Sequence, residues 1–301
     1  MTLILLMSIL LAHAQEITIS KEEVLRIETE LASDKMEGRE IFTPGIQRAS
    51  TFIEAEFTSI DLAFYGDLKN YRQEFTTKGK SANNVIGILP GKSLPNEYVI
   101  FSAHYDHLGI KKNGHDKIYN GANDDASGVT AVIALAKYFK ESAKNERTII
   151  FVAFTGEEVG GFGSAFFSKG IETDQVVAMF NIEMIGTESK WGTNSAFITG
   201  YEKTNFGEIL QKNLKGTDFN FYPDPYPQQQ LFYRSDNARL AAVGVPAHTI
   251  STSKMDSEEN YHQVSDEVST LDLDNMTRII KAIQLSSQSI IDGKDTPSRV
   301  K

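Results

Sequence analysis

Polar side chains able to bind a metal follow three apolar runs of the sequence, each at the point where the run ends. His104-Tyr105-Asp106-His107 follows "EYVIFSA", Gly156-Glu157-Glu158 follows "RTIIFVAFT", and Glu183 follows "VVAMFNI". A fourth group, Asn123-Asp124-Asp125, comes directly before a helical stretch that starts near Ala126. Ligands of open α/β sheets bind outside the carboxyl ends of the strands, and imidazole combined with carboxylates favours zinc. The pattern therefore predicts a divalent metal site at this edge of a sheet.

Each of these groups also has an ordinary structural explanation. His104 could be a hydrogen-bonded core histidine, Asp124 or Asp125 could cap the following helix, and two adjacent glutamates could lie on a solvated loop. Glu183 is harder to explain in this way, because an unpaired carboxylate at the end of a buried strand is costly. All four explanations would have to hold on one sheet edge, so a shared metal site is favoured.

Short β-type runs alternate with helices in the part of the chain that would position these groups. We expect β-type runs at residues 84–89, 97–103, 147–154, 176–184, 195–200 and 245–250. We expect helical stretches at 21–40, with a break at Gly38, at 43–62, with Pro44 and Gly45 in the turn before the helix, and at 126–143, 205–214, 236–244 and 272–292. The alternation indicates an α/β fold with a mostly parallel central sheet and helices on both faces. We predict a single domain at residues 15–301, with a helical lead-in at 15–80 and the α/β core at 81–295.

The composition excludes several classes of function. The chain has 301 residues, of which 41% are hydrophobic, and a formal net charge of -10, which argues against a nucleic-acid partner. It has no cysteine, so no disulfide and no thiolate ligand is available. "GILPGKS" at residues 87–93 resembles a phosphate-binding loop, but its glycine spacing is one residue short and no helix follows. Nucleotide binding is therefore not expected.

The first residues resemble a secretory signal peptide. An apolar run at residues 3–11 is followed by Ala12-His13-Ala14, a small-x-small cleavage pattern. The run is too short to span a bilayer and no second long apolar stretch follows, so no membrane span is expected. We predict a signal peptide at residues 1–14, a mature chain that starts at Gln15, and a secreted or periplasmic location. The alternative is an N-terminal hydrophobic helix that stays in place.

Longer motifs resemble those of a known enzyme family. "AHYDHLG", "YNGANDDASGVTAV", "TGEEVGGFGS", "FYRSDNARLAAVGVPA" and "YHQVSDEVSTLD" occur in the order and spacing of a two-zinc metallopeptidase family. That family includes secreted bacterial leucyl aminopeptidases, aminopeptidase Y and, more distantly, glutamate carboxypeptidase II. "LASDKMEGREIFTPG" resembles the opening segment of the family, so the resemblance covers nearly the whole predicted mature chain. It implies the zinc exopeptidase fold, which is phosphorylase/hydrolase-like.

The resemblance also implies roles for single residues. It implies two zinc ions with five ligands: His104, Asp124, Glu158, Glu183 and His262. Asp124 is the bridging ligand because the bridging aspartate of the family lies four residues before the glycine that is Gly128 here, and a cis peptide is expected after it. Asp106 would orient His104 from outside the coordination sphere. Glu157 would be the general base.

Two positions depart from the family pattern. Glu183 stands where many members carry aspartate, so the geometry or occupancy of the metal near His104 could differ. Asn237, in "SDN", stands where a histidine is frequent, and we expect it to tune the site. An oxyanion donor is also needed, and Tyr261 or Tyr233 could supply it; we favour Tyr261.

The expected function is that of an exported zinc aminopeptidase acting on peptides. Two metals about 3.5–4 Å apart would share a water of lowered pKa, and Glu157 would take its proton and pass it to the leaving amine. The alternatives are a single-zinc glutaminyl cyclase on a related fold, a carboxypeptidase or dipeptidase of the same family, and a non-catalytic relative with a degraded site. Presence of Glu157 and of all five ligand positions argues against the last.

Overall fold

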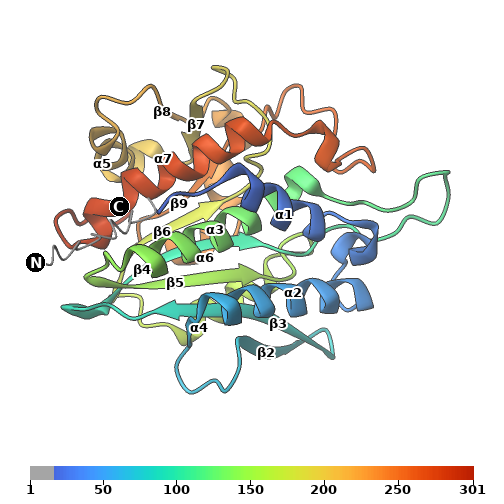
Figure 1. The fold of residues 1–301 in the computed structure, drawn as a ribbon, viewed down its shortest axis with the longest axis horizontal. Helices are drawn as coiled ribbons and strands as arrows, with labels where there is room; N and C mark the ends of the chain where they lie inside the picture. The colour runs from blue at the N-terminus through green and yellow to red at the C-terminus, as the bar shows by residue number, and fades with distance from the viewer. Residues whose placement is uncertain (1–16) are drawn as a thin grey trace, which may run out of the picture.

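A nine-stranded mixed sheet with helices packed on both of its faces forms the molecule (Figure 1). The structure is a computed structural model and describes residues 17–301. The predicted signal peptide at residues 1–14 and the predicted mature start at Gln15 lie outside the described residues. Within residues 17–301, none of the helices combines the length and the apolar character that a bilayer crossing requires.

The central strands of the sheet are parallel, the pairs of β3 with its neighbours and of β7 with β9 are antiparallel, and the edge pair β7-β8 is again parallel. The order is β1-β3-β5-β4-β6-β9-β7-β8, with β2 paired to β3. The pairs β5-β4, β4-β6 and β6-β9 are parallel, whereas β3-β5 and β7-β9 are antiparallel. The strands are β1 (Ala63–Phe64), β2 (Arg72–Thr77), β3 (Lys80–Leu89), β4 (Leu94–His104), β5 (Arg147–Phe154), β6 (Val176–Ile182), β7 (Ser195–Ile198), β8 (Asn220–Pro223) and β9 (Ala247–Ser251).

The helices form one layer on each face of the sheet (Figure 1). The α-helices are α1 (Lys21–Leu31), α2 (Pro44–Ile60), α3 (Ser127–Ser142), α4 (Phe162–Gly170), α5 (Phe206–Asn213), α6 (Ala238–Ala241) and α7 (Leu273–Ile291). Short helical turns are η1 (Asp34–Arg39), η2 (Ala122–Ala126), η3 (Tyr201–Lys203), η4 (Pro227–Gln229), η5 (Leu231–Tyr233) and η6 (Val268–Thr270).

The period-2 geometry of a strand explains why both faces of the sheet are apolar. Along β5, which is buried throughout, Phe151 belongs to the core cluster shared with α1, α2, α3 and α7. Its neighbour Val152 points to the other face and belongs to the cluster shared with α4 and α6. The continuous apolar run "RTIIFVAF" therefore serves two cores at once, as expected for a strand covered on both faces.

The predicted α/β fold is confirmed, and all six predicted β-type runs and all six predicted helical stretches contain the corresponding elements. Within the 21–40 stretch, helix α1 ends at Leu31 and the short turn η1 follows at Asp34–Arg39. The lead-in is not only helical, because β1 and β2 lie within it and pair with β3. Those strands, β8 and helix α4 were not predicted. β1 is an exposed dipeptide, and β2 is polar except for the buried Phe75, so neither has the apolar pattern of a core strand.

Three of the candidate groups meet because their strands are parallel and in register. His104 ends β4 and pairs with Phe154, which ends β5 directly before the turn that carries Glu157. β6 lies on the other side of β4, and its last residue, Ile182, precedes Glu183. The carboxyl ends of β4, β5 and β6 thus share one sheet edge, as the sequence predicts.

Candidate metal centre

Asp124 stands at the centre of the group of predicted ligands. It lies in η2, directly before α3, and is buried. Its Oδ1 is 3.3 Å from Nε2 of His104, and its Oδ2 is 3.3 Å from Nε2 of His262. The peptide bond between Asp124 and Asp125 is cis, which confirms the expectation drawn from the resemblance. One carboxylate therefore faces a different histidine with each of its oxygens, as a bridging ligand must.

Asp125 has a different place in the structure although it is the next residue. Its carboxylate accepts hydrogen bonds from three backbone amides, those of His104 at 3.3 Å, Gly128 at 3.0 Å and Met184 at 3.0 Å. These amides belong to the end of β4, the start of α3 and the residue after Glu183. Asp125 thus joins the segments that carry the candidate ligands, and its bond with Gly128 engages the first turn of α3.

The contacts of Asp106 differ from the expected one. Nδ1 of His104 lies 3.1 Å from the backbone carbonyl of Asp106 and 3.8 Å from its carboxylate. A carbonyl oxygen can only accept, so this contact places a proton on Nδ1 and leaves Nε2 as the ring nitrogen that faces Asp124. The carboxylate of Asp106 instead accepts from the backbone amides of Glu157 at 3.1 Å and Glu158 at 3.3 Å. It therefore holds the turn that carries both glutamates.

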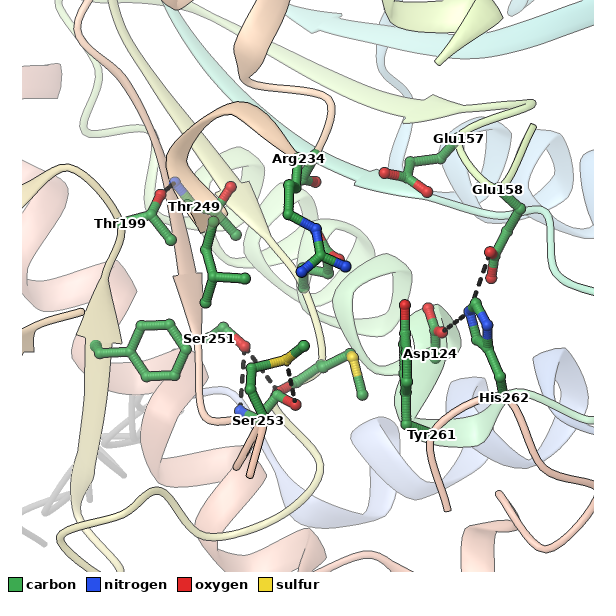
Figure 2. Close-up of a pocket in the computed structure, with 16 residues that line it drawn as sticks. Asp124, Glu157, Glu158, Thr199, Arg234, Thr249, Ser251, Ser253, Tyr261 and His262 are labelled. Carbon is green, nitrogen blue, oxygen red and sulfur yellow. Dashed lines mark hydrogen bonds and ion pairs between the residues drawn. The ribbon is translucent and has the colours of Figure 1, made fainter. Parts of the chain in front are cut away.

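The two adjacent glutamates point in different directions (Figure 2). Glu158 faces His262, with Oε2 3.1 Å from Nε2. Glu157 lines a cavity, and its carboxylate takes part in no hydrogen bond or ion pair within residues 17–301. The turn after β5 therefore separates one carboxylate that is engaged by imidazoles from one that is free to exchange a proton.

Charge and burial act differently on the carboxylates of this group. Burial alone would raise the pKa values of Asp124 and Glu158, but hydrogen bonds with the surrounding histidines hold both below their usual range. Hydrogen bonds with the same two carboxylates raise the pKa of His262 to about 10. Burial raises the pKa of Glu157 well above that of an ordinary carboxyl, against the opposing effect of His104. Such a difference between neighbouring carboxyls is typical of sites that divide ligand and acid/base work.

The spacing of the nitrogen and oxygen atoms fits zinc. Two atoms that each lie about 2.0–2.1 Å from one tetrahedral zinc ion are about 3.3 Å apart. The contacts of Asp124 with His104 and His262 are both 3.3 Å, and that between His262 and Glu158 is 3.1 Å. Neutral imidazole and carboxylate are also the donors that zinc prefers. The residues present therefore fit the expected metal.

Glu183 has the environment of a carboxylate that needs a cation. It is on the wall of the same cavity, its Oε2 is buried, and that atom has no hydrogen-bond partner within the described part of the chain. No ion pair joins Glu183 to Lys or Arg among residues 17–301. Burial raises its pKa, and Asp124 and Glu158 add to this effect while His104 opposes it. A metal shared with His104 would satisfy the uncompensated oxygen.

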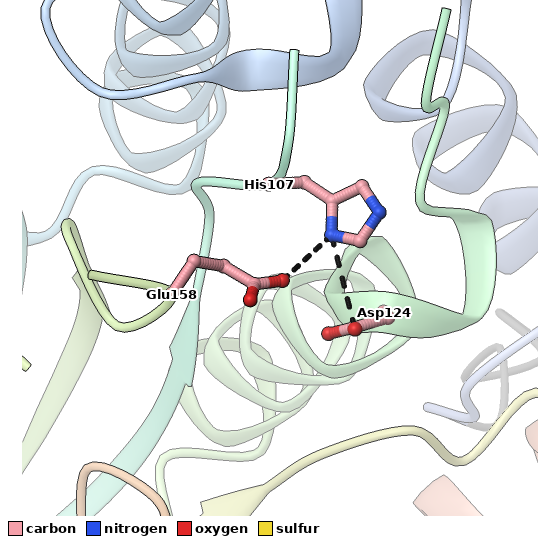
Figure 3. A group of neighbouring side chains, drawn as sticks. All are labelled: His107, Asp124 and Glu158. Carbon is pink, nitrogen blue, oxygen red and sulfur yellow. Dashed lines mark hydrogen bonds and ion pairs between the residues drawn. The ribbon is translucent and has the colours of Figure 1, made fainter. Parts of the chain in front are cut away.

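His107 was not assigned a role from the sequence, yet it is part of this group (Figure 3). It is buried, and its Nδ1 lies 2.9 Å from Oε1 of Glu158 and 3.8 Å from Oδ2 of Asp124. One donor atom from each of these three residues lies within 4.8 Å of the others, so together they could hold a metal. Because His107 contacts the oxygen of Glu158 that does not face His262, it is also placed to orient that carboxylate. Its position in "HYDH", just after β4, was the available signal.

Two further charged residues support the loop that carries Asp124. The carboxylate of Asp266 accepts from the backbone amides of Asn123 at 2.8 Å and Asp124 at 3.0 Å. Arg39 is fully buried. Its guanidinium donates hydrogen bonds of 2.9 Å or shorter to four backbone carbonyls, those of Tyr105, Leu31, Asn120 and Gly121. Arg39 thus connects the N-terminal segment with the loops that follow β4. Neither residue could be predicted from local sequence, because their partners lie far along the chain.

A cavity of about 270 Å³ opens beside the candidate ligands and contains one of the two candidate tyrosines. Tyr261 lines it, with its ring stacked on His262 at a centroid distance of 3.9 Å. Tyr233 is exposed and does not line this cavity. Asn237 is buried below the cavity, where its amide oxygen accepts from the hydroxyl of Thr249, a lining residue. Its influence on the site is therefore indirect.

Residues 84–286, more than half of the chain, match the model of Peptidase family M28. A "Probable zinc metalloprotease" of Pyricularia oryzae is 34% identical over 109 residues, which are 36% of this chain and 22% of that protein. Aminopeptidase YwaD of Bacillus subtilis is 29% identical over 131 residues, which are 40% of this chain and 27% of that protein. The chain thus spans about a quarter of the length of these curated relatives.

Solved structures of similar fold include different kinds of enzyme. The zinc aminopeptidase BSAP from Bacillus subtilis superposes with a TM-score of 0.75 at 13% identity, over 94% of this chain and 98% of that one. A glutaminyl cyclase from Porphyromonas gingivalis superposes with a TM-score of 0.71 at 14% identity, over 92% and 100%. At these identities the similarity is one of fold alone.

Proposed function

Because the chain belongs to peptidase family M28, we propose that it is a zinc-dependent aminopeptidase that removes residues from the free N-terminus of peptides. The observation that carries the proposal is the position of Asp124 between two histidines. Its two carboxylate oxygens each lie 3.3 Å from an imidazole nitrogen, one of His104 and one of His262. A carboxylate held between two such donors suits a pair of metal ions. The name of one curated relative, Aminopeptidase YwaD, points the same way.

We assign the five predicted ligands to two zinc ions that share Asp124. Glu158 and His262 would hold one ion, and His104 and Glu183 the other, with Asp106 supporting the turn at Glu157. When bound, zinc supplies a water of lowered pKa and polarises the substrate carbonyl. These assignments leave Glu157 as the carboxylate in the cavity without a ligand role.

The chain's own groups would move the proton and stabilise the developing charge. Glu157 accepts the proton of the attacking water and returns it to the leaving amine, a task suited to a carboxyl of raised pKa. Burial and the neighbouring carboxylates raise the pKa of Tyr261, so its hydroxyl keeps its proton and can donate to the oxyanion. The carboxylates at this end of the cavity also suit the positive charge of a free α-amino group.

Location is a separate part of the proposal. The apolar run at residues 3–11 and the Ala12-His13-Ala14 pattern support an exported enzyme that matures at Gln15. Zinc aminopeptidase and glutaminyl cyclase share this fold, so the activity has to be tested directly.

We expect hydrolysis of leucine p-nitroanilide and of peptides with a free N-terminus, and loss of hydrolysis when the same substrates are N-acetylated. Acetylation removes the positive charge that the carboxylates would bind. Release of p-nitroaniline and chromatography of the peptides measure both. Equal cleavage of blocked substrates would remove the aminopeptidase assignment, cleavage from the C-terminus would favour a carboxypeptidase, and cyclisation of an N-terminal glutamine without hydrolysis would favour glutaminyl cyclase.

A further inference from the structure

We propose that Arg234 binds a carboxylate on the residue that follows the cleaved bond, so that substrates with a carboxylate on that residue are preferred over substrates without one. This proposal rests on the proposed aminopeptidase function and adds a substrate class to it. The carboxylate is supplied by the free C-terminus of a dipeptide or by an acidic side chain at the same position of a longer peptide.

Arg234 is the one Lys or Arg among the residues that the structure assigns to the cavity wall. It follows η5, and its guanidinium points into the cavity, between Glu157 on one side and Ser251 on the other (Figure 2). Its side chain is exposed, and its hydrogen bond to Gln229 Oε1 is long, at 3.3 Å. No carboxylate lies within ion-pair distance of Arg234 in residues 17–301, so its charge is not neutralised by the described part of the chain.

The charged side chains on the cavity wall suggest which group of a substrate Arg234 binds. The carboxylates on the wall are Asp124, Glu157, Glu158 and Glu183, and three of them are assigned to metal ligation. These carboxylates suit a cationic amine, and the arginine suits an anion. A zwitterionic dipeptide has both charges, and the cavity wall has a group of opposite sign for each of them. A guanidinium is also the side chain best shaped to bind a carboxylate with two parallel hydrogen bonds.

The length of a dipeptide fits this arrangement. From the carbonyl carbon of the cleaved bond to the C-terminal carboxyl carbon there are only three covalent bonds of about 1.3–1.5 Å each. The C-terminal carboxylate must therefore stay within about 4 Å of the reacting carbonyl, inside the cavity that contains both Arg234 and Glu157. Each added residue moves the C-terminus outward by up to about 3.5 Å. The C-terminal carboxylates of longer peptides thus leave the reach of the arginine.

The test compares Leu-Ala, Leu-Ala amide and Leu-Asp amide as substrates of the wild type and of Arg234→Gln. We expect the wild type to prefer a carboxylate-bearing substrate over Leu-Ala amide by about ten- to hundredfold in kcat/KM. Arg234→Gln should bring this ratio close to one, mainly through KM, and Arg234→Lys should restore part of it. Preference for Leu-Ala identifies the C-terminus as the source, and preference for Leu-Asp amide identifies the side chain.

Lys254→Gln is the matched control. Lys254 lies between Ser253 and Met255, which line the cavity, but it does not line the cavity itself and pairs with Glu188 at 3.4 Å. The substitution removes one positive charge near the cavity and should leave the ratio of kcat/KM values for carboxylate-bearing and amidated substrates at its wild-type value. A wild-type ratio near one, or a ratio that survives Arg234→Gln, overturns the proposal.

Calorimetric binding of the same three compounds to Glu157→Gln, in which hydrolysis should be slowed at least about a hundredfold, separates the two proposals. Hydrolysis of Leu-Ala amide without any carboxylate preference contradicts only the role of Arg234. Absence of all hydrolysis contradicts the aminopeptidase function. In that case the carboxylate site is still supported if Leu-Ala binds more tightly than its amide and if this difference is lost in the double variant Glu157→Gln/Arg234→Gln. Equal binding of the two overturns it.

Discussion

Replacement of Glu157 by glutamine should lower turnover by about a hundredfold to ten-thousandfold and leave the metal content intact. Glutamine keeps the shape of the side chain but cannot accept a proton from water. The carboxylate of Glu157 has no hydrogen bond or ion pair in the described part of the chain and lines the cavity. Its loss should therefore affect the chemical step and not the binding of metal. Steady-state kinetics and elemental analysis of the same sample measure the two effects.

Glu158→Gln is the matched comparison, because it makes the same change one residue away. Glu158 lies 3.1 Å from His262 and 2.9 Å from His107, so its replacement disturbs the group of proposed ligands. We expect this variant to lose metal as well as activity, and excess zinc to restore part of the activity. Equal metal loss in both variants would mean that the two roles are assigned wrongly.

Replacement of Glu183 by alanine should reduce the zinc content from two ions per chain to one. Its buried Oε2 has no partner within residues 17–301, and a desolvated carboxylate in that position needs a proton or a cation. A metal shared with His104 and Asp124 is the partner we propose. Because the side chain is longer than the aspartate that the resemblance leads us to expect there, this ion should also be the more exchangeable of the two.

Glu188→Ala provides the control for that measurement. Glu188 is exposed, pairs with Lys254 at 3.4 Å and lies outside the cavity wall, so its removal should leave both ions bound. If Glu183→Ala also retains two ions, Glu183 is not a ligand and its burial has another cause.

The sequence predicts the place of a candidate ligand well where that residue stands at the end of an apolar strand. His104 and Glu183 follow such runs, and the parallel register of β4, β5 and β6 is enough to bring them to one edge. Asp124 is harder, because spacing alone does not distinguish it from Asp125. The resemblance selects Asp124, and the structure gives a physical reason: Asp125 is occupied by three backbone amides.

Other features depend on contacts between distant parts of the chain. Asp266 supports the loop before α3 from more than a hundred residues away, and Arg39 does so from the N-terminal segment. Neither has a local pattern, because a buried ion that binds backbone groups is defined by the fold around it. The contact of Asp106 with the amides of Glu157 and Glu158 was missed for the same reason. The expected contact is with the ring of His104, only two residues from Asp106. The amides of Glu157 and Glu158 instead follow β5, about fifty residues further along the chain.

The central claim is that hydrolysis at the free N-terminus requires zinc at the site around Asp124. The most direct test removes metal from the wild-type enzyme with a chelator and then titrates zinc back while hydrolysis of leucine p-nitroanilide is measured. We predict no activity without metal, and full recovery as zinc approaches two equivalents per chain, with fluorescence or circular dichroism showing that the metal-free chain stays folded. Activity that survives complete removal of metal would contradict the account.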